Sequence, residues 1–183
     1  LMKRLLLLRH AKSSWSDPRQ ADFERPLNPR GRKACERLGP FLAEQVRPPA
    51  LVLCSPALRT RETWERIAQA TGWDAPVRHE RSLYAASTVA LRDLLSNLGD
   101  AEGAASMLIV GHNPALQDLA VSLIGRGRAD QIEKLTDKLP TGGLVEMEAD
   151  FGAWANLTPG CARLLGFVTP RRLPAAKPGV ADG

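Results

Sequence analysis

The sequence has no long apolar run, few aromatic residues and few cysteines, and each shortage excludes a class of protein. No apolar run approaches the roughly 20 residues that a membrane-spanning helix needs, so we expect a soluble protein outside the membrane. Phe, Trp and Tyr make up 5% of the 183 residues, which leaves no base-stacking platform for nucleic acid. The three cysteines, an odd number in no metal-binding spacing, predict reduced thiols rather than a disulfide framework.

What is present indicates one globular domain. The chain carries a formal net charge of +5 and has a pI near 9.5, which allows an anionic partner. The basic residues are scattered among acidic ones, so no cationic stripe for nucleic acid is visible. We expect a folded domain over residues 1–169 and a disordered tail rich in Pro and Ala over residues 170–183. The lack of an apolar stripe that would remain exposed favours a monomer.

The N-terminal apolar run is short. It covers residues 5–8 and is ended by Arg9 and His10, without the small-residue cleavage site of a signal peptide. We therefore expect a cytoplasmic protein.

Four short apolar runs predict the strands of a central sheet. Their residues do not alternate with polar ones, which is typical of strands covered on both faces in parallel sheets. They lie at residues 5–8, 51–54, 107–110 and 164–168. A fifth segment, residues 144–148, alternates apolar and acidic residues and is predicted to be an edge strand.

Segments between these runs have the spacing of helices. Leucine-rich stripes at residues 91–98 and 116–124, and a pattern over residues 57–70, each predict a helix with one buried face. Asn28 and Pro29 are typical of a helix start, and Pro40 is expected to kink or interrupt that helix. Strands that alternate with helices predict an α/β fold, a three-layer α/β/α arrangement with a mostly parallel central sheet.

Cationic or imidazole side chains follow three of the predicted strands. Arg9 and His10 come directly after the first, Arg59 lies in the first turn of the helix after the second, and His112 follows the third. Because the carboxyl ends of parallel strands meet at one edge of a sheet, we expect these four side chains to converge. Two guanidiniums and two imidazoles suit a phosphoryl group. An imidazole flanked by cations stays neutral near pH 7, so we predict that His10 is a nucleophile that becomes a phosphohistidine.

These segments resemble the histidine phosphatase superfamily, which has the phosphoglycerate-mutase-like fold. Residues 9–11, Arg-His-Ala, are similar to its Arg-His-Gly signature, and residues 55–63 and 111–114 are similar to its second and third motifs. Residues 9–15 and 25–31 resemble most the small SixA-type phosphohistidine phosphatases. Ala11, in place of the usual glycine, tells against a sugar-phosphate mutase.

The resemblance implies site residues, cofactor and substrate. It implies that His10 is phosphorylated, that Arg9, Arg59 and His112 bind the phosphoryl group, that no metal or other cofactor is required, and that the substrate is a protein phosphohistidine.

Two further residues are weaker candidates. Relatives carry a glutamate between the second and third motifs that protonates the leaving group, and Glu80 is the best-placed match, although it is equally consistent with a solvated residue. Ser16 is predicted to contact phosphate or to cap a turn. Residues 13–27 are predicted to form a wall or lid over the site. Lys12 and Arg25 either steer an acidic substrate or are only solvated.

Other enzyme classes would require residue patterns that differ from this one. A cysteine phosphatase requires a fixed loop length between cysteine and arginine, and from Cys54 the spacing is one residue too short to Arg59 and one too long to Arg61. A metallohydrolase using His10 and His112 is disfavoured by the neighbouring arginines. A small-molecule phosphomonoester phosphatase of the same superfamily and a non-catalytic module that binds phosphorylated ligands remain open.

Overall fold

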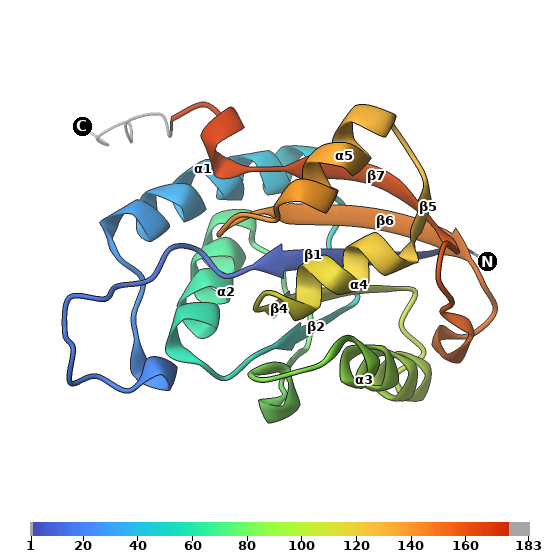
Figure 1. Ribbon diagram of the computed structural model, residues 1–183, viewed down its shortest axis with the longest axis horizontal. Helices are drawn as coiled ribbons and strands as arrows, with labels where there is room; N and C mark the ends of the chain where they lie inside the picture. The colour runs from blue at the N-terminus through green and yellow to red at the C-terminus, as the bar shows by residue number, and fades with distance from the viewer. Residues whose placement is uncertain (1, 176–183) are drawn as a thin grey trace.

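One seven-stranded sheet, in the order β3-β2-β4-β1-β6-β7-β5, organises the computed structural model, which describes residues 2–175 (Figure 1). β1 is parallel to β4, β4 to β2, β2 to β3 and β5 to β7, whereas β6 is antiparallel to both β1 and β7. The predicted α/β fold with a mostly parallel sheet is confirmed. The strands are β1 (Met2–Arg9), β2 (Leu51–Cys54), β3 (Val77–His79), β4 (Ser106–Gly111), β5 (Ile124–Arg126), β6 (Leu144–Asp150) and β7 (Ala162–Val168).

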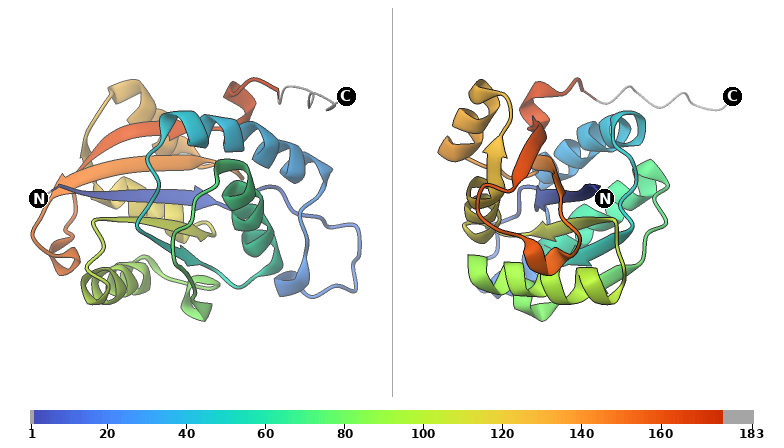
Figure 2. Two further views of the ribbon diagram at one scale, coloured as in Figure 1. Left: turned by 180° about the vertical axis from the view of Figure 1, so that it is seen from behind. Right: turned by 90° about the vertical axis from the view of Figure 1, so that its right-hand side faces the viewer.

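Helices cover both faces of the sheet (Figure 2). Apolar side chains of α1 and α2 pack on one face, and those of α3, α4 and α5 pack on the other. The helices are α1 (Pro29–Gln45), α2 (Leu58–Thr71), α3 (Thr88–Ala101), α4 (Ala115–Leu123) and α5 (Ala129–Asp137), with short 3-10 helices η1 (Asp22–Glu24), η2 (Arg81–Leu83), η3 (Trp154–Asn156) and η4 (Pro170–Arg172). Within the described residues, no helix is both long and apolar enough to cross a membrane.

The run of four leucines in β1 is explained by its central place. Leu5 and Leu7 belong to the core under α3, α4 and α5, while Leu6 and Leu8 belong to the core under α1 and α2. Successive side chains of a strand point to opposite faces, so only a strand covered on both sides buries all four.

Two local contacts position the tip of β1. The Asn28 side chain accepts a hydrogen bond from the Gly31 backbone N–H at 2.8 Å and caps α1, as predicted. A Cβ at Gly31 would collide with the Lys12 carbonyl oxygen, so glycine lets the first turn of α1 pack against the backbone just beyond β1. Gly142, in the left-handed region at φ 72°, donates its N–H to the carbonyls of Arg9 and His10, both at 3.0 Å.

The prediction that residues 144–148 form an edge strand is wrong. β6 lies between β1 and β7. Alternation reports only that one face of a strand is partly open, and here Glu146 and Glu148 are half-buried on the face where α1 covers Leu144. The position of a strand in a sheet depends on backbone pairing, which alternation does not encode.

β7 and α1 also depart from the sequence expectations. β7 alternates buried and exposed residues and pairs antiparallel with β6, so its apolar run is not a strand buried on both faces. α1 is not interrupted at Pro40: the helix continues through this residue, which is exposed, although proline cannot donate to the carbonyl of Glu36.

The tail predicted over residues 170–183 lies partly outside the described residues. Of its described part, residues 170–172 form η4, where Pro170 is buried, and Leu173 packs against the core under α1 and α2. Residues 176–183 fall outside the described part of the chain.

Candidate active site

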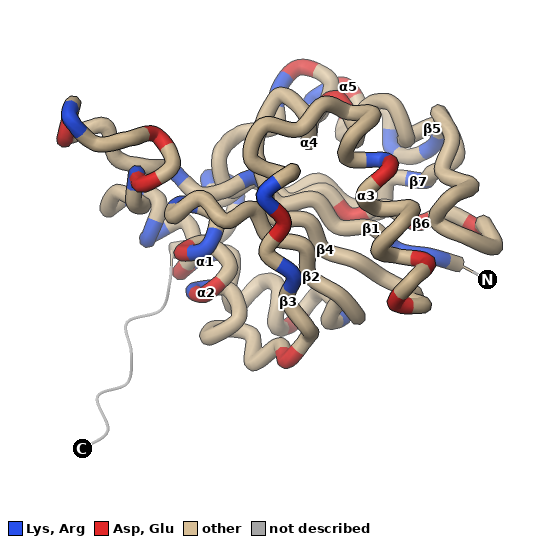
Figure 3. The backbone as a smooth tube through the Cα atoms, turned by 90° about the horizontal axis from the view of Figure 1, so that it is seen from below, with Lys and Arg blue, Asp and Glu red and all other residues tan. Residues whose placement is uncertain are grey.

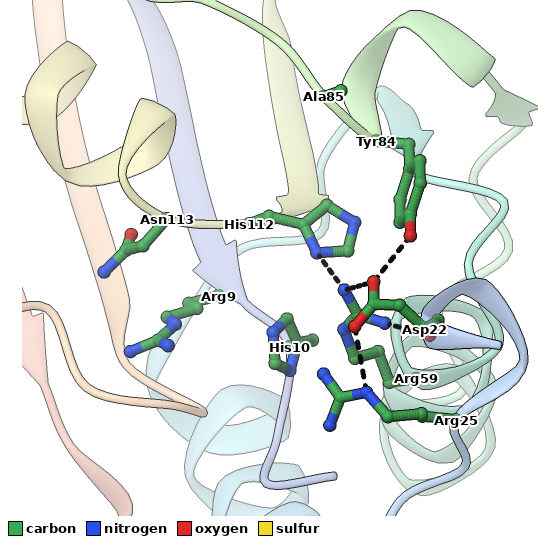
Figure 4. Close-up of a pocket in the computed structure, with 9 residues that line it drawn as sticks. All are labelled: Arg9, His10, Asp22, Arg25, Arg59, Tyr84, Ala85, His112 and Asn113. Carbon is green, nitrogen blue, oxygen red and sulfur yellow. Dashed lines mark hydrogen bonds and ion pairs between the residues drawn. The ribbon is translucent and has the colours of Figure 1, made fainter. Parts of the chain in front are cut away.

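A pocket of about 420 Å³ lies beyond the carboxyl ends of β1, β2 and β4 (Figure 4). The four side chains predicted to converge all line it. Arg9 ends β1 and His10 follows it, Arg59 lies in the first turn of α2, and His112 follows β4. The lining residues are Arg9, His10, Asp22, Arg25, Arg59, Tyr84, Ala85, His112 and Asn113.

The hydrogen bond of His10 fixes its tautomer. Its Nδ1 lies 2.7 Å from the Ala11 carbonyl oxygen, which only accepts hydrogen bonds, so Nδ1 carries the hydrogen. In the neutral ring the lone pair is then on Nε2, which has no hydrogen-bond partner among the described residues. The backbone N–H of Ala11 donates to Thr63 Oγ1 at 3.0 Å and holds this carbonyl in place. His10 is only 6% exposed.

The surroundings of His10 keep its ring neutral. Burial is the main cause that lowers its pKa to about 3, and the nearby His112, Arg59 and Arg9 act in the same direction, against the hydrogen bond to Ala11. At neutral pH His10 therefore presents an unprotonated Nε2, the state that a nucleophile requires.

His112 is held beside His10 with the opposite tautomer. The ring centroids are 5.3 Å apart. Arg59 can only donate, and its terminal nitrogen lies 3.4 Å from His112 Nδ1, so Nε2 carries the hydrogen and donates to Ser55 Oγ at 2.7 Å. Burial, followed by Arg59, lowers the pKa of His112 to about 4. Ser55, fully buried at the end of β2, orients this ring, a role that the sequence did not indicate.

Arg9 and Arg59 each have a buried N–H donor without a hydrogen-bond partner among the described residues. Arg9 donates to the Leu139 carbonyl at 3.0 Å, but its Nε has no partner among the described residues. The Nε of Arg59 is also buried and has no partner in the described part of the chain. Burial lowers the pKa of Arg9, and neighbouring Arg59 lowers it further. A buried donor without an acceptor is costly, and both guanidiniums line the pocket, where their positive charge suits an oxyanion.

Asp22 is a pocket residue that sequence reasoning missed. Its carboxylate accepts hydrogen bonds from Arg59 at 3.1 Å, from Arg25 Nε at 3.0 Å and from the Tyr84 hydroxyl at 2.5 Å. The Tyr84 hydrogen bond is the main cause that lowers the pKa of Asp22 to about 2. Asp22 is therefore anionic at neutral pH and occupies donors that a phosphoryl oxygen would otherwise use.

The loop over residues 13–27 forms a wall of the pocket through Asp22 and Arg25. Arg25 also donates to Ser13 Oγ at 2.7 Å, and its guanidinium lies 3.5 Å from the centroid of the Trp15 ring. These contacts anchor the loop. The only sequence sign of a role for Asp22 was its place in a long charged loop, and for Tyr84 that it is the chain's single tyrosine.

The two weaker candidates lie outside the pocket lining. Glu80 follows β3, an edge strand, and its backbone N–H donates to the Cys54 carbonyl at 3.0 Å. The chain then turns through η2 and brings Tyr84, rather than Glu80, to the pocket. Ser16 is exposed and pairs with Ser14 Oγ at 2.8 Å. The roles predicted for Glu80 and Ser16 stay predictions.

Cys54 is placed unlike a nucleophilic cysteine. Its thiol is fully buried, and burial raises its pKa to about 12, so it stays a thiol at neutral pH. Among the described residues, no group of three or more His, Cys, Asp or Glu side chains is arranged to hold a metal ion.

The fold and the pocket define an α/β protein with a cationic, histidine-bearing site at the carboxyl edge of its sheet. Residues 5–86 match the family model for the histidine phosphatase superfamily (branch 1). An uncharacterised protein of Mycobacterium tuberculosis is 37% identical over 166 residues, covering 90% of this chain and 100% of the relative. The chain belongs to the histidine phosphatase superfamily.

Solved structures agree with this assignment. A protein of Nakamurella multipartitia, provisionally assigned as the phosphohistidine phosphatase SixA, is similar with a TM-score of 0.77 at 26% identity, covering 93% of this chain and 97% of its own. A protein of Agrobacterium tumefaciens with the same provisional assignment has a TM-score of 0.75 at 28% identity, covering 92% of this chain and 98% of its own.

Proposed function

We propose that this protein is a phosphatase that forms a covalent phosphohistidine on His10 and acts on protein phosphohistidine. The observation that carries the proposal is the unpartnered Nε2 of a neutral, buried His10 in a pocket with the buried Nε donors of Arg9 and Arg59. The similarity to proteins assigned as SixA supports the choice of substrate. The location in the cytoplasm stays a prediction.

The first step transfers the phosphoryl group to the enzyme. The lone pair of His10 Nε2 forms a bond to phosphorus while the bond to the substrate nitrogen breaks, and the departing imidazole takes a proton from solvent. Arg9 and Arg59 stabilise the charge on the equatorial oxygens. An oxygen of the phosphoryl group displaces Asp22 from Arg59.

The second step releases inorganic phosphate. Water attacks phosphorus, the bond to His10 Nε2 breaks, and the electron pair returns to that nitrogen. Because the Ala11 carbonyl keeps the hydrogen on Nδ1, His10 leaves as a neutral imidazole rather than as an imidazolate. The attacking water gives its proton to solvent, and His112 stays beside the phosphoryl group with its Nε2–H held by Ser55.

The covalent step is tested by trapping. A labelled phosphodonor is mixed with enzyme and quenched in alkaline detergent, because a phosphohistidine survives base and is lost in acid. We expect label on the unsubstituted protein and none on His10→Ala. Ligand binding without label or hydrolysis would indicate a non-catalytic binding module and refute the proposal.

The substrate class is tested by comparing kcat/KM for a phosphohistidine peptide, sugar phosphates and nucleotides. We expect the peptide to be preferred. If His10 is labelled but a phosphomonoester is the preferred substrate, the covalent mechanism stands and the protein is a small-molecule phosphatase.

A further inference from the structure

A second concave site lies on the same edge of the sheet as the pocket. It is a groove of about 820 Å³, roughly twice the volume of the pocket, between α1, the end of α5 and η4. α1 and α5 lie on opposite sides of β6 and β7, at the end where β7 leads into η4 (Figures 1 and 2). Since β6 is antiparallel to both β1 and β7, the carboxyl ends of β1 and β7 point the same way.

The groove is strongly cationic. Over most of the chain, Lys and Arg positions mix with Asp and Glu (Figure 3). Around the groove, eight basic side chains gather against one carboxylate, that of Asp137. The basic residues are Lys12, Arg30, Lys33, Arg37, Lys134, Lys138, Arg171 and Arg172.

Within residues 2–175, these basic side chains form no ion pairs. All of them but the half-buried Arg37 are exposed. Arg37 donates to the Pro170 carbonyl at 3.5 Å. Like charges at one surface raise the local positive potential and attract anions. The groove is therefore suited to a ligand that carries several negative charges.

One segment of backbone separates the groove from the pocket. The Leu139 carbonyl accepts from Arg9 and from Asn113 on the pocket side, at 3.0 and 2.9 Å. The next two residues, Pro140 and Thr141, line the groove. On the other side, Lys12 lies two residues after His10 and also lines the groove. A substrate whose phosphoryl group lies in the pocket therefore has a short path along its own chain into the groove.

We propose that the groove docks an acidic segment of the phosphoprotein substrate, close to the phosphorylated residue. The inference rests on the phosphatase function proposed above. A small phosphomonoester has no extended chain that would reach the groove, whereas a polypeptide bound through its phosphoryl group extends beyond the pocket. Phe167, buried, is the only aromatic residue among those that line the groove, so nucleic-acid bases have no exposed ring to stack on.

The test compares two phosphohistidine peptides that differ only in an acidic flank, Asp and Glu in one and Asn and Gln in the other. The groove variant is Arg30→Glu with Lys33→Glu, on the exposed face of α1. The matched control, Arg47→Glu with Arg126→Glu, changes the net charge equally at exposed positions outside the groove and the pocket.

We expect the unsubstituted protein to prefer the acidic peptide by about tenfold in kcat/KM, mostly through KM, and to lose the preference at high salt. The groove variant is expected to lose that preference while its kcat/KM for the neutral peptide stays the same. The control is expected to keep the preference. An unchanged preference in the groove variant would overturn the docking proposal and leave the phosphatase function standing.

A binding measurement separates the groove from the chemistry. Fluorescence anisotropy of an unphosphorylated, labelled acidic peptide is expected to show binding to the unsubstituted protein and weaker binding to the groove variant, even if neither peptide is hydrolysed. If the acidic peptide binds more weakly to the groove variant but no phosphohistidine peptide is hydrolysed, the phosphatase function is refuted and the docking proposal stands. Tighter binding of a single-stranded oligonucleotide than of the acidic peptide would overturn the choice of an acidic polypeptide.

Discussion

Acidification is expected to destabilise this protein through the two histidines of its pocket. Burial is the main cause that lowers the pKa of His10 to about 3 and that of His112 to about 4, whereas an imidazole in an unfolded chain titrates near about 6.5. Between about pH 6.5 and these folded values, the unfolded state binds protons that the folded state does not. The free energy of unfolding therefore falls as the pH falls through this window.

The magnitude follows from the width of the window. At about pH 5, roughly 1.5 pH units below the unfolded pKa, each histidine accounts for a loss of about 2 kcal/mol, at about 1.4 kcal/mol per unit. Two such losses are a large part of a typical stability of about 5–15 kcal/mol. Asp22 affects stability at lower pH, because folding lowers its pKa from 3.8 to about 2. Its contribution to the free energy of unfolding is therefore still present at about pH 5.

Urea unfolding at about pH 7.5 and about pH 5 measures this loss for the unsubstituted protein and for His10→Gln. We expect the variant to lose about 2 kcal/mol less than the unsubstituted protein between the two pH values. His79→Gln, at an exposed position of β3, controls for the removal of an imidazole as such. Equal losses in the unsubstituted protein and His10→Gln would refute the conclusion that His10 is buried in its neutral form.

Three substitutions test other contacts of the structure. Asp22→Asn removes the carboxylate that competes for Arg59, so vanadate is expected to inhibit the variant at severalfold lower concentration; weaker inhibition would mean that Asp22 helps to bind oxyanions. Ser55→Ala removes the acceptor that orients His112, and we expect kcat to fall severalfold with KM nearly unchanged in steady-state kinetics; a change confined to KM would contradict an orienting role. Gly31→Ala forces the backbone clash at the start of α1 and is expected to cost about 1–3 kcal/mol in thermal denaturation; an unchanged melting temperature would contradict the close approach.

The sequence predicted those parts of the fold and site that depend on short-range pattern. The apolar runs identified β1, β2 and β4, and the convergence of Arg9, His10, Arg59 and His112 followed from the rule that parallel strands end at one edge. The capped start of α1 at Asn28 was also evident, because capping depends on residues only three positions apart.

The missed features depend on contacts between distant segments. Asp22 and Tyr84 are 62 positions apart, and their hydrogen bond joins η2 to a loop in which Arg25 contacts Ser13 and Trp15. No periodicity encodes such a loop. Glu80 is the match for the general acid by its position between the second and third motifs, but that position does not reveal the turn at η2, after which Tyr84 lines the pocket.

The pairing of Asp22 with Arg59 bears on how the pocket selects its ligand. The Asp22 carboxylate has one negative charge and accepts hydrogen bonds from Arg59 and Arg25 in the free protein. The Nε donors of Arg9 and Arg59 have no partner among the described residues. A phosphoryl dianion brings twice the charge and three acceptor oxygens, and so gains contacts that Asp22 leaves unmade. Its binding energy must first exceed that of the internal pair, and an anion with a single charge has less electrostatic attraction with which to do so. We therefore expect Asp22 to favour phosphoryl groups over the carboxylates of an acidic segment, which agrees with the proposal that such a segment binds in the groove between α1 and α5.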